Sequence, residues 1–135
     1  APVILHCCGK TLDRMSYIKD AGFEAFHFAT ENDPHQAKEA VGEFKLIGNV
    51  SNFVTLYTGR PEDVATEVTD ILDAAVDIVA PECAVPQQVS DENLRAVVTS
   101  ARGEFLPSPD VEDPRNLASE YRAQVAAQSS PALLT

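Results

Sequence analysis

Three residues carry side chains that could bind zinc together, and each stands at the end of an apolar run. His6 and Cys8 close the run 3–8, and Cys83 closes another run 75 positions after Cys8. Side chains two residues apart in a strand lie on the same face, so His6 and Cys8 can bind one ion together while Cys7 points away. One imidazole and two thiolates favour Zn²⁺ over Mg²⁺ or Ca²⁺. Three protein ligands leave a fourth position open, as in catalytic zinc sites.

Other titratable residues near these runs are candidates either for a fourth zinc ligand or for structural positions. Glu31 follows the second apolar run and is a candidate for the fourth zinc position, for which Glu82 competes. Cys7 is expected in the core, because it points off the zinc face. His27, between two phenylalanines, is expected to be a hydrogen-bonded core histidine rather than a ligand. His35 is expected to be exposed in the first turn of a helix.

The surrounding sequence alternates apolar runs with segments of helical periodicity, four times over. Strands are expected at 3–8, 23–28, 45–50 and 77–83, and helices at 11–21, from Pro34 to Gly42, from Pro61 onward, and from a Ser90 cap to Arg102 and Gly103. Such alternation predicts an α/β fold with a parallel sheet covered by helices. Neither a phosphate-binding loop nor a Gly-x-Gly turn follows a strand, which disfavours a nucleotide-binding fold.

The expected strands also explain how distant residues could meet. In (β/α) barrels, active sites form at the carboxyl ends of the strands. His6 and Cys8 end the first expected strand and Cys83 ends the fourth, so all three are predicted on one rim of the sheet.

Composition narrows the classes of function. The 135-residue chain has 44% hydrophobic and 23% charged residues, which suits one globular domain. A net charge of −11 disfavours binding to nucleic acid or to anionic membrane surfaces. No segment approaches the roughly 18 apolar residues of a membrane span. Three cysteines, an odd number, do not suggest a disulfide framework. Zinc-binding thiolates must stay reduced, so a location in the reducing cytoplasm is expected.

Three sequence segments carry a resemblance to a known family. They are Val-Ile-Leu-His-Cys-Cys-Gly at 3–9, Leu-Ile-Gly-Asn-Val at 46–50 and Ala-Pro-Glu-Cys-Ala-Val-Pro at 80–86. Over about residues 2–103 the chain resembles the uroporphyrinogen decarboxylase superfamily, and within it the methylcobamide:coenzyme M methyltransferases of methanogenic archaea. The zinc branch of that superfamily has a His-x-Cys…Cys signature, which falls on His6, Cys8 and Cys83.

The resemblance implies a fold and a reaction. The fold would be a (β/α)8 TIM barrel, of which residues 1–105 supply about four βα units as its C-terminal half. Residues 106–135 would form a Pro-rich acidic linker and a short helical tail. The reaction would move a methyl group from a methyl-Co(III) corrinoid on a partner protein to a zinc-bound thiolate, with coenzyme M as the acceptor. The resemblance also places a Gly-Asn turn on the pocket floor, where Asn49 and Asn52 could orient substrate.

Two other functions remain open from the sequence. One is a decarboxylase-type lyase, which would need arginines and aspartates to hold a tetra-acidic porphyrinogen. The other is a non-catalytic zinc-binding or regulatory half-barrel. Four βα units cannot close an eight-stranded barrel, so the same or another polypeptide is expected to supply the remainder. The start within a strand, without methionine or leader, favours a fragment of a longer protein.

Overall fold

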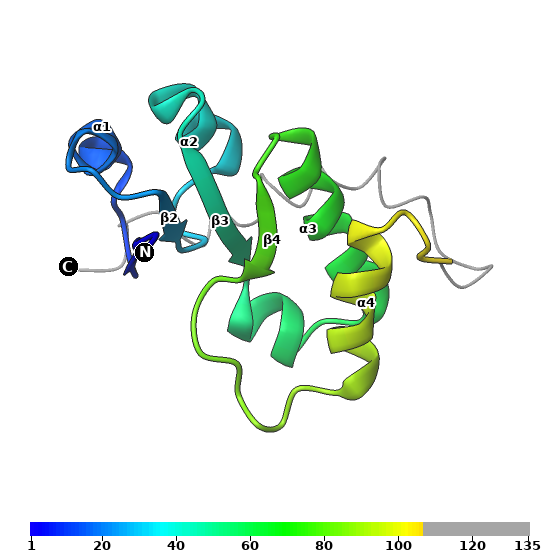
Figure 1. Ribbon diagram of the computed structural model, residues 1–135. Coiled ribbons are helices and arrows are strands. Elements are labelled where there is room, and N and C mark those ends of the chain that lie inside the picture. The colour runs from blue at the N-terminus through cyan, green and yellow to red at the C-terminus, as the bar shows by residue number, and fades with distance from the viewer. Residues whose placement is uncertain (107–135) are drawn as a thin grey trace, which may run out of the picture.

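A single parallel sheet with helices packed on it makes up the part of the chain that the structure, a computed structural model, describes, residues 1–106 (Figure 1). The elements in chain order are β1 (Ile4–Cys7), the 3₁₀-helix η1 (Leu12–Arg14), α1 (Met15–Asp20), β2 (Ala25–Phe28), α2 (Pro34–Val41), β3 (Lys45–Val50), the π-helix η2 (Asn52–Tyr57), α3 (Pro61–Asp73), β4 (Ile78–Pro81) and α4 (Asp91–Ala101). The strands are all parallel and lie in the order β1-β2-β3-β4. The predicted α/β fold with a parallel sheet is confirmed. The predicted linker and tail lie outside the described residues, apart from Leu106.

Two strands end earlier than the sequence pattern predicted. β1 ends at Cys7, because Gly9 with φ of +82° turns the chain away from the sheet. β4 ends at Pro81, and one further backbone hydrogen bond, from the Glu82 N–H to the Val50 carbonyl oxygen, follows it. Cys8 and Cys83 therefore stand in the loops just beyond their strands, where the backbone can bring them together.

Helical structure also differs from the prediction in two places. The helix expected at 11–21 is divided into η1 and α1. A π-helix, η2, occupies the segment after β3 that was expected to be a loop. Its sequence is rich in aromatic and β-branched residues, which have low helix propensity. The helix forms because the Ser51 hydroxyl accepts from the Val54 N–H and because Leu56 is fully buried.

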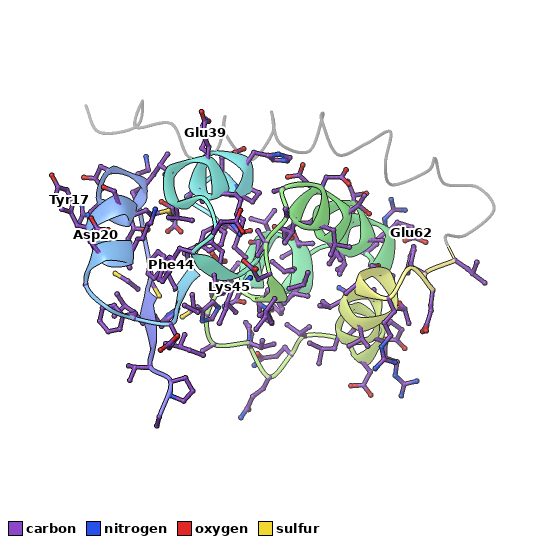
Figure 2. The ribbon with its side chains drawn as sticks, turned by 45° about the horizontal axis from the view of Figure 1, so that its top comes forward. Tyr17, Asp20, Glu39, Phe44, Lys45 and Glu62 are labelled. Carbon is purple, nitrogen blue, oxygen red and sulfur yellow. The ribbon has the colours of Figure 1, made fainter. Side chains whose placement is uncertain are left out.

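The core lies between the sheet and the helices. Strand residues that alternate toward the helices, such as Phe26, Phe28 and Leu46, are fully buried against apolar side chains of the helices. Helices α3 and α4 lie side by side (Figure 1). On the outer surface Tyr17 of α1 and Glu39 of α2 project away from the sheet (Figure 2).

The opposite face of the sheet carries a different row of side chains. The strand register aligns His6, His27, Ile47 and Ile78 across all four strands. Ile4 and Ile78 are each 55% exposed, although both lie in strands. Within residues 1–106, no helix is long and apolar enough to cross a membrane.

Candidate metal centre

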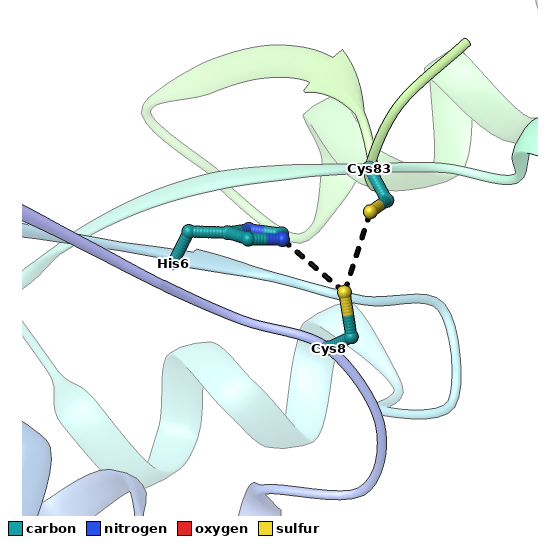
Figure 3. A group of neighbouring side chains, drawn as sticks. All are labelled: His6, Cys8 and Cys83. Carbon is teal, nitrogen blue, oxygen red and sulfur yellow. Dashed lines mark hydrogen bonds between the residues drawn. The ribbon is translucent and has the colours of Figure 1, made fainter.

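His6, Cys8 and Cys83 meet at the carboxyl ends of β1 and β4 (Figure 3). The His6 Nε2 atom lies 3.2 Å from the Cys8 Sγ atom, and the two sulfur atoms of Cys8 and Cys83 are 3.3 Å apart. All three potential ligand atoms lie within 4.8 Å of one another. The structure thus brings together the three residues that the sequence singled out.

β2 and β3 lie between β1 and β4 in the sheet, so the chain after β4 must reach back over these two strands toward β1. Its contacts with β2 show this path. The Nε2–H of His27 on β2 donates to the Pro81 carbonyl oxygen at 2.8 Å. The Glu82 carboxylate accepts from the backbone N–H of Thr30, just after β2, at 2.9 Å. This crossing carries Cys83 to Cys8.

The three ligand atoms fit Zn²⁺. Zinc binds sulfur at about 2.3 Å and imidazole nitrogen at about 2.0 Å, so tetrahedral ligands are separated by about 3.5–3.8 Å. The separations of 3.2 and 3.3 Å need to widen by only a few tenths of an ångström. Because all three residues are exposed, a fourth ligand can approach from outside.

The electrostatics of the group favour a positive charge. The pKa of the Cys8 thiol is raised, first by its hydrogen bond with Cys83, then by desolvation, and then by the negative charges of Cys83, Glu31 and Cys7. Each of these influences disfavours a bare thiolate. A cation bound by the three ligand atoms would instead favour the Cys8 thiolate, because its positive charge stabilises the deprotonated sulfur.

The predictions for neighbouring residues had mixed outcomes. The hydrogen bond predicted for His27 is confirmed, but the residue is half-buried on the sheet face opposite the core rather than within it. The prediction that Cys7 lies in the core was wrong: Cys7 is exposed, because β1 is an edge strand of this sheet. His35 is half-buried rather than exposed, because its Nε2 atom pairs with the Asp70 carboxylate of α3 at 3.2 Å.

The two glutamates differ in what they do. Glu31 is exposed and close enough to influence Cys8, but it lies outside the group of three ligands. Glu82 binds backbone groups of two other loops, with one oxygen on Thr30 and the other on the Asn52 N–H at 3.0 Å. Its carboxylate therefore points toward those loops.

Asn49 and Asn52 are both buried, and their side chains donate hydrogen bonds to backbone carbonyl oxygens. Asn49 donates to the Asn32 carbonyl oxygen at 3.0 Å, and Asn52 donates to that of Ala84 at 2.7 Å. Gly48 and Asn49 lie within β3, so the turn expected there is absent from this part of the chain. The role expected of both asparagines in orienting substrate stays a prediction.

Asn32 joins the loops after β1 and β2, and the sequence did not single it out. It is 1% exposed, and its Oδ1 atom accepts from the backbone N–H groups of Thr11 and Leu12 at 2.7 and 2.9 Å. Its Nδ2 atom donates to the carbonyl oxygen of Gly9, the residue after Cys8, at 2.9 Å. The available signal was an asparagine in the short loop between β2, which ends at Phe28, and the Asp33 helix cap.

A comparison with protein families matches residues 1–103 to uroporphyrinogen decarboxylase (URO-D). Among curated proteins, the chain is 32% identical over 104 residues to the methylcobamide:CoM methyltransferase MtaA of Methanosarcina barkeri, covering 76% of this chain and 30% of that protein. It is 30% identical over 113 residues to the methylated-thiol–coenzyme M methyltransferase of Methanosarcina mazei, covering 83% of this chain and 31% of that protein.

A solved structure, a methyltransferase from Methanosarcina mazei, superposes with a TM-score of 0.73 at 28% identity. The superposition covers 76% of this chain and 31% of that one. The chain thus spans about 30% of the length of the relatives it matches. The fold is of the (β/α)8 barrel type, and the four βα units described above are part of it.

Proposed function

This chain belongs to the uroporphyrinogen decarboxylase family, and on that basis we propose that its protein is a zinc-dependent methyltransferase. It would move a methyl group from a methyl-corrinoid on a partner protein to a small thiol, with coenzyme M as the first candidate. The names of the relatives support this class of reaction. The observation that carries the proposal is the convergence of His6, Cys8 and Cys83 within 4.8 Å.

The ligand set suits the activation of a thiol. His6, Cys8 and Cys83 would hold the ion from one side, and their exposure leaves the other side open to an incoming sulfur. Zn²⁺, when bound, would act as a Lewis acid that keeps the acceptor thiol deprotonated near neutral pH. Two cysteine thiolates supply negative charge to the ion, which preserves the nucleophilicity of a third sulfur.

The rest of the proposed machinery belongs to the remainder of the barrel. Further strands would cover the sheet face that carries His27 and Ile78, and would come from the same or another polypeptide. The corrinoid would arrive over the rim formed by the loops after β1 and β4, where the three ligands are exposed. Glu31, on the loop after β2, is a candidate to occupy the fourth zinc position while no thiol is bound.

The lyase alternative has less support in this part of the chain. It needs arginines at the strand ends to pair with several carboxylates. Within residues 1–106, the arginines lie on helices or at their caps, as Arg14 of η1 and Arg95 of α4 illustrate. His6, Cys8 and Cys83, the proposed zinc ligands, lie at the strand ends where such arginines would be needed.

Metal analysis and X-ray absorption test the proposal. The purified protein should contain about one zinc per chain, with one nitrogen and two sulfur protein ligands. Adding coenzyme M should raise the sulfur coordination by one, and methyl transfer from a methyl-corrinoid should then be measurable by the change in the corrinoid spectrum. Zinc that gained no sulfur from any thiol would support a non-catalytic zinc module, and a protein without zinc would refute the proposal.

A further inference from the structure

We propose that Glu82 is a positioning residue for the metal centre, holding Cys83 at the distance from Cys8 that one ion requires. The inference deepens the proposed function and rests on the same three ligands. Glu82 precedes Cys83 directly, but its carboxylate points to the loops after β2 and β3. It therefore acts on the ion only through the backbone of its neighbour.

The Glu82 carboxylate receives three hydrogen bonds from two loops. One oxygen accepts from the backbone N–H of Thr30 at 2.9 Å and from the hydroxyl of the same residue. The other oxygen accepts from the backbone N–H of Asn52 at 3.0 Å. One side chain thus ties the loop after β4 to the loop after β2 and to the start of η2.

The residues on either side of Cys83 are held as well. The backbone N–H of Glu82 donates to the Val50 carbonyl oxygen at 2.8 Å, which continues the β3–β4 pairing. Beyond the cysteine, the Ala84 carbonyl oxygen accepts from Asn52 Nδ2 at 2.7 Å. Cys83 itself is exposed, so the position of its sulfur depends on this fixed backbone and on one side-chain torsion.

Only a carboxylate satisfies this arrangement fully. An ionised glutamate accepts at both oxygens and donates nothing. A glutamine would have to direct its NH₂ group at an N–H of Thr30 or Asn52, because both are donors. One of the two loops would then be released, and residue 83 would gain freedom to move away from Cys8.

The chain offers a matched control for the loss of charge. Glu24 is exposed at the opposite end of β2, so Glu24→Gln removes the same charge away from the three ligands. Thr30→Val removes the hydroxyl donor and leaves the backbone N–H, which tests the same link from the partner side. Cys83→Ser, loaded with excess Co²⁺ because tight binding is lost, supplies the reference spectrum of a site with a single sulfur ligand.

The test uses Co²⁺ in place of zinc, because cobalt reports its ligands by absorption. Glu82→Gln should weaken Co²⁺ binding by about 10–100-fold, as for other residues that orient metal ligands. Its sulfur-to-cobalt charge-transfer band should fall toward that of Cys83→Ser, with a smaller change in Thr30→Val and none in Glu24→Gln. Far-UV circular dichroism should show that each variant is folded.

The outcomes separate this inference from the proposed function. A wild-type protein that binds cobalt through two sulfurs, beside a Glu82→Gln variant with the same affinity and spectrum, overturns the positioning role alone. A Glu82→Gln variant with a lower melting temperature and unchanged cobalt affinity does the same, because its carboxylate then serves only the fold. A wild-type protein that binds neither cobalt nor zinc overturns the proposed function.

Discussion

The sulfur atoms of Cys8 and Cys83 lie 3.3 Å apart, although 75 positions separate the two residues and their strands are not neighbours in the sheet. The strands alone do not produce this approach. It depends on loops that are joined by hydrogen bonds from the buried side chains of Asn32, Asn49 and Asn52 and from the half-buried Glu82.

Replacement of Cys83 by serine should abolish tight zinc binding. A hydroxyl is a poor zinc ligand beside a thiolate, and two protein ligands are fewer than zinc sites in proteins use. Zinc per chain after gel filtration should fall from about one to well below one. Cys7→Ser makes the same change at an exposed cysteine outside the group and should leave the zinc content unchanged. Equal losses in both variants would contradict the assignment of the ligands.

Replacement of Asn32 by alanine should destabilise the fold and weaken metal binding together. The buried Thr11 N–H donates to the Asn32 side chain and would lose this acceptor. The Gly9 carbonyl oxygen would lose its hydrogen bond to the loop after β2. Orphaned buried groups cost about 1–3 kcal/mol each, so the free energy of unfolding should fall by about 3 kcal/mol. Urea denaturation measures this change, with the exposed Gln36→Ala as a control that should shift it little.

Asp77 should make the fold sensitive to acid. Desolvation is the largest single influence on the Asp77 carboxyl and acts to raise its pKa, but the hydrogen bonds from Lys45, the Leu46 N–H and Lys38 together outweigh it and lower the pKa. The folded pKa is below the unfolded value of about 3.9. Its contribution to stability is therefore complete above pH 4 and is lost as pH falls through the folded pKa. Asp77→Asn should lower stability at pH 7, and its stability should fall less between pH 5 and pH 2. A parallel acid dependence in both proteins would contradict this role.

Gly48 should not tolerate a side chain. A Cβ atom there would stand 2.7 Å from the Phe28 carbonyl oxygen, and the backbone φ of +138° is one that other residues rarely adopt. Strain and overpacking together predict a loss of about 3 kcal/mol for Gly48→Ala. Gly42 also has a positive φ, but nothing lies within 4 Å of its Cβ position, so Gly42→Ala should cost clearly less. Thermal unfolding of the two variants compares them directly.

The fold followed from sequence signals that are local. Apolar runs, a Pro34 at a helix start and a Ser90 cap predicted alternation of strand and helix, and parallel strands put their carboxyl ends on one rim. That shared rim predicted Cys8 and Cys83 at the same edge of the sheet, while their 3.3 Å approach depends on the loops beyond the strands. The helix η2 could not be predicted from local signals. Its residues have low helix propensity, and the helix depends on the burial of Leu56 in the folded chain.

The supporting polar residues were harder to predict than the ligands. Glu82 was considered only as a competing ligand, since its position beside Cys83 says nothing about which loops lie within reach. Its partners Thr30 and Asn52 are 52 and 30 positions away. From the sequence Asn32 resembles an ordinary turn residue, and only the structure shows that its side chain binds the loop after β1. Hydrogen bonds between residues so far apart in the chain leave no recognisable spacing pattern in the sequence.

The sheet face that carries Ile4 and Ile78 has a consequence for the behaviour of the chain in solution. Apolar attraction between two such faces draws molecules together, while a net charge of −11 on each holds them apart. Salt screens the repulsion and leaves the attraction, so light scattering from solutions of a chain with this face open should rise with ionic strength. Once further strands cover the face, that response should disappear, and colloidal behaviour alone would then report whether the barrel is closed.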